Sequence, residues 1–166
     1  MKSKRLILLF VIIVVLLIIF FTTNLFRNRK IIDYNQGMEN AIIEYTKENV
    51  YSKYHNRPKF EMYESHKVFE VEKKWNRIYV YAYVLNEIHY MRDDVMGITA
   101  NIDPVVIVLK EEDQGKYRVT KLKTPESGEG YPSSIRSLFP KHIAEKIFNN
   151  RADIHTELTN TMQKIK

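Results

Sequence analysis

A run of 16 residues near the N-terminus, 6–21, carries only hydrocarbon and aromatic side chains: LILLFVIIVVLLIIFF. After Thr22, Thr23 and Asn24 the apolar character resumes in 25–26, so the apolar segment 6–26 spans 21 residues. As a helix rising about 1.5 Å per residue, it would reach about 31 Å, which matches the ~30 Å hydrocarbon core of a bilayer. Because lipid offers the backbone no hydrogen-bond partners, such a segment must be helical despite its many β-branched residues. The sequence therefore predicts a transmembrane helix over 6–26.

The alternative interpretation of this segment is a cleaved signal peptide. Such a peptide has an apolar region of about 7 to 15 residues, followed by small residues at the cleavage site. The run here is longer and continues into 20–25, FFTTNL, without a small-residue site. The chain has no cysteine, which excludes a lipidated N-terminal cysteine. We therefore expect the segment to remain attached as an anchor.

Basic residues flank both ends of the apolar segment: Lys2, Lys4 and Arg5 before it, and Arg27, Arg29 and Lys30 after it. The positive-inside rule therefore gives little bias in orientation. Because a short basic N-terminus before a first apolar segment typically stays in the cytoplasm, we expect 1–5 to be cytoplasmic. A juxtamembrane linker over 27–33 and an extracytoplasmic domain over 34–166 would follow. The expected location is the cell membrane, with a single pass and lipid contact through the N-terminal helix.

The net charge of +6 belongs to the flanks of the apolar segment. Six of the 26 Lys and Arg residues precede Ile31, and the remaining 20 equal the 20 Asp and Glu residues of the chain. A balanced domain is not typical of phosphate-backbone binding, so we expect no nucleic-acid partner. The flanking cations are instead typical of contacts with lipid headgroups. The absence of cysteine also argues against a small disulfide-rich secreted domain.

The remaining 136 residues, 31–166, are enough for one domain with its own core. Asp33 is a candidate N-cap for a long helix in which Tyr34, Met38, Ile42 and Tyr45 recur at spacings of three and four. This helix must end before Pro58, because the residue ahead of a proline avoids helical geometry.

Strand-like runs follow at 59–64 and 67–73 (one strand or two), 77–90, 104–110 and 116–123. The dense β-branched and aromatic residues of 77–90 are typical of a central strand covered on both sides. In the next run, Pro104 is expected at the start of its strand. Asp93, Asp94 and Gly97 are expected in or near the preceding loop.

Amphipathic helices are expected in the C-terminal part, over about 133–139 and 141–149, with a last helix containing Ile154, Leu158 and Met162. Short connections favour an antiparallel meander, and we expect the amphipathic helices to cover one of its faces. The fold class is therefore α+β: a transmembrane helix, one long helix, a meander of about four strands and C-terminal helices. This plan resembles the cystatin-like and nuclear-transport-factor-like folds.

A second resemblance lies in 125–140, PESGEGYPSSIRSLFP, which an amphipathic helix follows. It is similar to a pattern in uncharacterised membrane-anchored or lipoprotein domains of Gram-positive bacteria. There a P-x-x-G-x-x-Y loop, matched here by Pro125, Gly128 and Tyr131, leads into S-I-x-x-L-F-P. The run 71–85, VEKKWNRIYVYAYVL, fits the same type, so the resemblance covers about 60–150. It implies an extracytoplasmic α+β domain and carries no activity or functional residue with it.

Residues with catalytic or metal-binding chemistry are present, but their spacing matches no known motif. The five histidines include no H-E-x-x-H pair, and zinc would need scattered ligands because cysteine is absent. Adjacent acids such as Glu70 and Glu72 are typical of a solvated face rather than of an acid–base pair in a cleft. Neither a G-x-S-x-G nucleophile nor a phosphate-binding loop occurs. We expect no catalytic residue, no metal and no cofactor.

Tyr79, Tyr81 and Tyr83 share one face of the 77–90 strand. Tyrosine is amphipathic and common on binding surfaces, so these side chains are the candidate binding residues and would line an aromatic groove. The alternative is that helices cover the face and the rings form core. The predicted function is a non-enzymatic binding or interaction module, with an envelope protein as a possible partner. The alternatives are a small-ligand or enzymatic pocket in the curved sheet, and an assembly subunit of a membrane complex.

Overall fold

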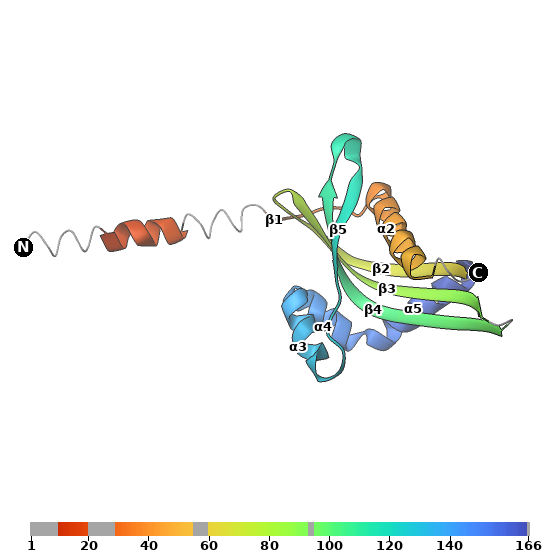
Figure 1. Cartoon of the computed structure of the whole chain (residues 1–166). Helices are drawn as coiled ribbons and strands as arrows, with labels where there is room; N and C mark the ends of the chain where they lie inside the picture. The colour runs from red at the N-terminus through yellow and green to blue at the C-terminus, as the bar shows by residue number, and fades with distance from the viewer. Residues whose placement is uncertain (1–9, 20–28, 55–59, 93–94, 166) are drawn as a thin grey trace, which may run out of the picture.

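The computed structural model describes residues 10–19, 29–54, 60–92 and 95–165 (Figure 1). Within these ranges the chain is α+β, and an antiparallel sheet is its centre. Residues 10–19 are helical. The further elements are β1 (Arg29–Ile31), α2 (Gln36–Tyr54), β2 (Phe60–Lys74), β3 (Arg77–Arg92), β4 (Val95–Glu111), β5 (Tyr117–Lys123), α3 (Tyr131–Leu138), α4 (Lys141–Asn149) and α5 (Arg151–Ile165).

The sheet is a five-stranded meander in the order β1-β2-β3-β4-β5, with each strand antiparallel to the next. The expected antiparallel meander of about four strands is confirmed, with one addition. Strand β1 lies within the expected linker 27–33 and pairs with the end of β2, where Arg29 is opposite Lys74. Its three residues are too short to show an alternating pattern, so sequence periodicity did not reveal it.

Gly97 lies in β4, two residues after its start at Val95, while Asp93 and Asp94 lie outside the described residues. One detail of the expected strands is wrong. Pro104 lies well inside β4, and not at its start. The ladder with β5 begins only at Val106, so Pro104 lies beyond it, where none of the described strands pairs on that side. A proline is tolerated there because no partner needs its missing N–H.

Strand β2 is one continuous strand of 15 residues, and it contains a β-bulge between Val68 and Glu70. Strict alternation predicts that Val68 and Val71 face opposite ways. Because a bulge adds one residue to a strand, both side chains contribute to the same core cluster, and Phe69 packs on the other side. This shift sets which residues of the first half of β2 face helix α2.

The helices cover both faces of the sheet, which corrects the expectation that they cover one (Figure 1). Helix α2 packs on one face through Met38 and Ile42, over β3 and β4 residues such as Val80 and Ile107. Helices α3 to α5 pack on the other face around Tyr83. The physical reason is the composition of β3, whose alternate side chains are apolar on both faces and require burial on both.

The N-cap of α2 is Asn35 and not Asp33, since the Asn35 Oδ1 accepts a hydrogen bond from the backbone N–H of Met38 at 3.1 Å. Of the apolar segment 6–26, only 10–19 is described, and its large side chains are exposed. Among the described residues, no helix has both the length and the apolar character that a membrane crossing requires.

Candidate functional site

A cavity of about 320 Å³ lies between the C-terminal half of α2 and the sheet. Its base is apolar and formed by strand residues that include Val84, Val105 and Ile107. Its remaining lining is mostly polar and comes from α2, β3, β4 and the end of β5: Tyr45, Thr46, Asn49, Asn86, Asn101, Asp103 and Thr124. An apolar base with a few polar groups around it is the usual composition of a small-molecule site.

The polar lining arises because the α2-facing sides of β3 and β4 change character along the strands. In β3, buried Val80, Ala82 and Val84 are followed on the same face by Asn86. In β4, the corresponding change leads to Asp103 and Asn101. Antiparallel pairing sets Asn86 opposite Asn101 and Val84 opposite Asp103, so the polar residues meet in one region under α2.

Glu64 of β2 extends this polar region, because it lies directly opposite Asn86. Its side chain is only 8 % exposed, yet neither carboxylate oxygen accepts a hydrogen bond from any described residue. The Asn86 Oδ1 is likewise buried without a hydrogen-bond partner in the described part of the chain. Buried polar atoms are nearly always hydrogen-bonded, and leaving one without a partner costs about 1–3 kcal/mol. In the structure, these buried atoms are therefore the strongest indication of a site that a ligand would occupy.

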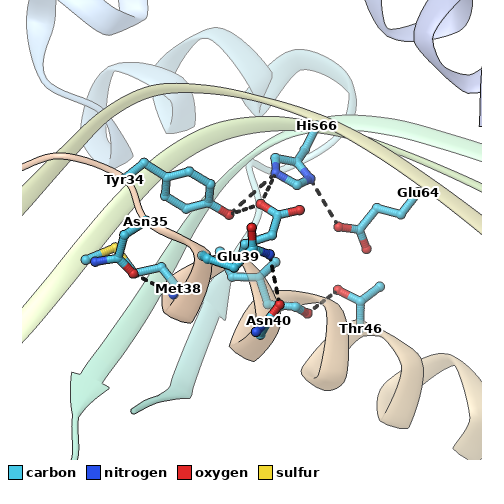
Figure 2. A network of polar contacts seen from close by, with 10 residues as sticks. Tyr34, Asn35, Met38, Glu39, Asn40, Thr46, Glu64 and His66 are labelled. Carbon is cyan, nitrogen blue, oxygen red and sulfur yellow. Dashed lines mark hydrogen bonds and ion pairs between the residues drawn. The ribbon is translucent and has the colours of Figure 1, made fainter. Parts of the chain in front are cut away.

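A polar network connects Glu64 to the start of α2 (Figure 2). The hydroxyl of Tyr34 donates a hydrogen bond of 2.6 Å to the Glu39 Oε2. The same oxygen lies 2.9 Å from the Nε2 of His66, and the other ring nitrogen, Nδ1, lies 3.4 Å from the Oε1 of Glu64. The imidazole therefore lies between two carboxylates, with an ion-pair contact and no hydrogen bond on the Glu64 side.

Titration in this network follows from the two carboxylates and from burial. Glu64 and then Glu39 raise the pKa of His66, although burial of the ring acts in the opposite direction. Burial, with the hydrogen bond and the charge of Glu39, raises the pKa of Tyr34 above its ordinary value. Tyr34 thus stays a neutral donor. Two carboxylates with one imidazolium leave an excess of negative charge, and Asp103 adds to it from the cavity wall.

The three tyrosines predicted as binding residues lie on the opposite face of the sheet from this cavity. Tyr81 and Tyr83 are 3 % and 0 % exposed and belong to the core under α3 to α5, whereas Tyr79 is half-buried. The Tyr81 hydroxyl donates to the Glu72 Oε2 at 3.0 Å, and the Tyr83 hydroxyl lies 3.3 Å from the His155 Nε2. Their positions match the alternative interpretation, in which helices cover this face and the rings form core. A groove here would require the C-terminal helices to move away.

The residues that form the cavity and the network were missed in the sequence. Glu64 and Asn86 are ordinary polar residues within the expected strand-like runs, and His66 and Asp103 lie just outside them. Only cross-strand register brings these residues together. One local signal was available, namely Asn86, a single polar residue between Val84 and Ile88 in the otherwise apolar alternation of β3.

The described residues contain no group of three or more His, Asp or Glu side chains placed to hold a metal ion. Comparison of the chain with protein-family models, with curated proteins and with solved structures finds no match. The assignment of function therefore depends on the geometry of this site.

Proposed function

We propose that this chain is a single-pass membrane protein that presents a non-enzymatic binding domain outside the cytoplasm, with the cavity under α2 as its binding site. The observation that carries the binding function is the buried Asn86 Oδ1 in the cavity lining, which accepts no hydrogen bond from the described residues. The buried carboxylate of Glu64 lies directly opposite Asn86 in the sheet, although Glu64 does not itself line the cavity. All three oxygens are acceptors, so the ligand must supply hydrogen-bond donors. The surplus of carboxylates favours a cationic donor, an ammonium or guanidinium group.

The size of the cavity limits the ligand. About 320 Å³ lies at the small end of the range of ligand pockets, which is roughly 300–1,000 Å³. The apolar base around Val105 and Ile107 would accept the hydrocarbon part of a small amine, while its ammonium group would lie toward Asn86 and Asp103. We therefore propose a small aliphatic amine or amino sugar as the ligand class.

Binding is favoured over catalysis by the state of the titratable groups. His66 does not line the cavity and is already engaged by Glu39 and Glu64. The hydroxyl in contact with His66 is that of Tyr34, whose pKa is raised, which makes it a poor nucleophile. The network is suited to hold a proton and to fix the position of Glu64.

The anchor is supported by the length and composition of 6–26 and by the basic residues on both of its sides. The assignment of the domain to a cystatin-like fold is also part of this proposal. A long helix lying across an antiparallel meander is the arrangement for which we propose a cystatin-like relationship. The similarity of 125–140 to membrane-anchored domains of Gram-positive bacteria supports the extracytoplasmic location.

The binding function is tested by adding putrescine, ethanolamine or glucosamine to the full chain in detergent and measuring its thermal unfolding. A ligand that binds only the folded state raises the midpoint temperature in proportion to its concentration. We expect at least one amine to do so, and E64Q to abolish the effect. The matched control is E157Q, which removes an exposed carboxylate on α5 and should keep the effect. Equal responses of the wild type and E64Q, or no response to any of the amines, would contradict the proposal.

The location is tested by cysteine labelling, because the chain has no cysteine of its own. Two single variants, S3C before the apolar segment and S127C in an exposed loop of the domain, are treated with a membrane-impermeant maleimide on intact cells. We expect S127C to be labelled on intact cells, and S3C only after lysis. The reverse pattern would invert the proposed orientation, and release of the protein by carbonate washing would refute the anchor.

A further inference from the structure

The tip of the β2–β3 hairpin carries the chain's one tryptophan, Trp75. The turn has two residues, Trp75 and Asn76. Trp75 has a φ of +58° and is 65 % exposed. It is therefore a large, mostly apolar side chain that projects from the end of the domain.

A tryptophan is an unusual residue for this turn. Two-residue hairpin turns with positive φ are normally occupied by Asn, Asp or Gly, because other residues meet steric strain there. Exposure of an indole to water is unfavourable as well. Strained and exposed features of this kind cluster at functional sites, and the location of the tip suggests which function this one serves.

The tip lies beside the point where the chain enters the domain. Trp75 follows Lys74 directly, and Lys74 is paired with Arg29 at the start of β1. Figure 1 shows β1 beside this end of the sheet. Phe26, the last residue of the apolar segment, is only three residues before Arg29. Three residues span at most about 11 Å, so a membrane that holds 6–26 must come close to this end of the sheet.

The surroundings of Trp75 are basic. The segments Arg29–Ile31 and 73–77 contain five cations and no acidic residue: Arg29, Lys30, Lys73, Lys74 and Arg77. Two carboxylates from outside these segments contact three of the cations. The Glu72 side chain lies 2.6 Å from the Lys74 Nζ and 3.4 Å from the Arg29 Nε, and Glu111 lies 2.6 Å from the Lys73 Nζ. An excess of three positive charges remains around the indole.

We propose that this hairpin tip is a second membrane contact, in which Trp75 enters the headgroup region and the surrounding cations bind the phosphates of anionic lipids. The inference rests on the proposed anchor. Tryptophan prefers the membrane interface, since its ring is apolar and its N–H donates to the polar layer. Lysine and arginine near the surface are attracted to anionic headgroups. Two contacts, one covalent and one at Trp75, would hold the sheet at a fixed angle to the bilayer.

The test uses the intrinsic fluorescence of the full chain, which reports Trp75 alone. The protein is reconstituted into vesicles of phosphatidylcholine with phosphatidylglycerol, and flotation first establishes that it is held by the vesicles. We expect emission at shorter wavelength than in the detergent-free unfolded chain, a severalfold lower quenching constant for iodide, and strong quenching by lipids brominated near the headgroup. In vesicles of phosphatidylcholine alone, the lipid quenching should be weaker.

The matched control is W75F/I98W, which moves the single tryptophan to an exposed position of β4 (Ile98 is 59 % exposed) toward the other end of the sheet. This reporter should be quenched by iodide and not by brominated lipid. If protein that floats with the vesicles shows the same quenching for Trp75 as for the control, the hairpin contact is refuted while the anchor stands. If the protein does not float, the anchor itself is refuted, and this inference with it.

Discussion

Gly37 in the first turn of α2 lies against the ring of Tyr117 on β5. A Cβ atom at position 37 would be 3.0 Å from the Cδ2 and Cε2 atoms of that ring and 3.2 Å from the carbonyl oxygen of Gly115. The Tyr117 hydroxyl in turn accepts a hydrogen bond of 3.2 Å from the side chain of Asn35, the residue that caps α2. The missing side chain at position 37 thus lets the helix start next to β5, where it forms one wall above the sheet.

This contact predicts the effect of G37A. Alanine favours a helix over glycine by at most about 1 kcal/mol, but overpacking against Tyr117 costs about 1–3 kcal/mol. We expect G37A to lower the free energy of unfolding by about 1 kcal/mol, measured by urea denaturation of the full chain in detergent. In a Y117A background the contact with the ring is gone and only the 3.2 Å contact with the Gly115 carbonyl oxygen remains, so the same substitution should be clearly less destabilising. A destabilisation of equal size in both backgrounds would show that the ring of Tyr117 is not the cause.

His66 predicts a pH dependence of stability. Glu64 and Glu39 raise its pKa in the folded state above the value of about 6.5 in the unfolded chain. The folded state therefore binds the proton more tightly, and the stabilisation is complete below the unfolded pKa and is lost as the pH rises through the folded pKa. We expect the free energy of unfolding to fall over that window, and H66Q to remove this fall.

The matched control for this measurement is His155 on α5, whose folded pKa is shifted the other way. Burial of its ring, followed by the charge of Arg151, lowers the pKa. Its contribution is then lost as the pH falls through the unfolded pKa toward the folded one. H155Q should therefore lessen the loss of stability on the acid side and leave the fall on the alkaline side in place. An alkaline fall that persists in H66Q would exclude His66 as its source.

The burial of Glu64 predicts that this residue lowers the free energy of unfolding while it serves ligand binding. At a pH where His66 is neutral, the Glu64 carboxylate is a buried charge without a hydrogen-bond donor among the described residues. We expect E64Q to raise the free energy of unfolding by about 1–3 kcal/mol there, because an amide is less unfavourable to bury than a carboxylate. Below the pKa of His66 the gain should shrink, since the imidazolium then compensates the charge. Denaturation of both variants across pH measures this, and a loss of stability in E64Q at alkaline pH would refute it.

The parts of the fold that the sequence predicted are those with a local signal. The two apolar faces of β3, the apolar stripe of α2 and the stripe Ile154, Leu158, Met162 of α5 are visible as periodicities of two or of three to four residues. All three lie in the elements where they were expected.

What the sequence could not predict depends on non-local pairing. The bulge at Val68 reverses the facing of half of β2, and the pairing of Glu64 with Asn86 is a matter of register across strands. Neither the bulge nor the register can be recognised from the local sequence pattern, because a strand residue has the same neighbours in the sequence whichever partner it faces. A groove on the tyrosine face of β3 was one of two interpretations of the sequence, and the cavity lies on the other face.

Tyr81 gives the sharpest test of how the tyrosine face is used. Its hydroxyl donates a hydrogen bond of 3.0 Å to the Glu72 Oε2, and both side chains are buried. Burial, followed by the charge of Glu72, raises the pKa of Tyr81 above its ordinary value, so the donor stays protonated. Y81F removes this donor from a buried carboxylate, and we expect it to lower the free energy of unfolding by about 1–3 kcal/mol.

The matched variant Y79F alters a half-buried ring that lies 5.0 Å from the Lys74 Nζ, and it should change stability by less than about 0.5 kcal/mol. Urea denaturation of the full chain compares the two, and equal stabilities for Y81F and the wild type would argue that this face is not closed core and would reopen it as a binding groove.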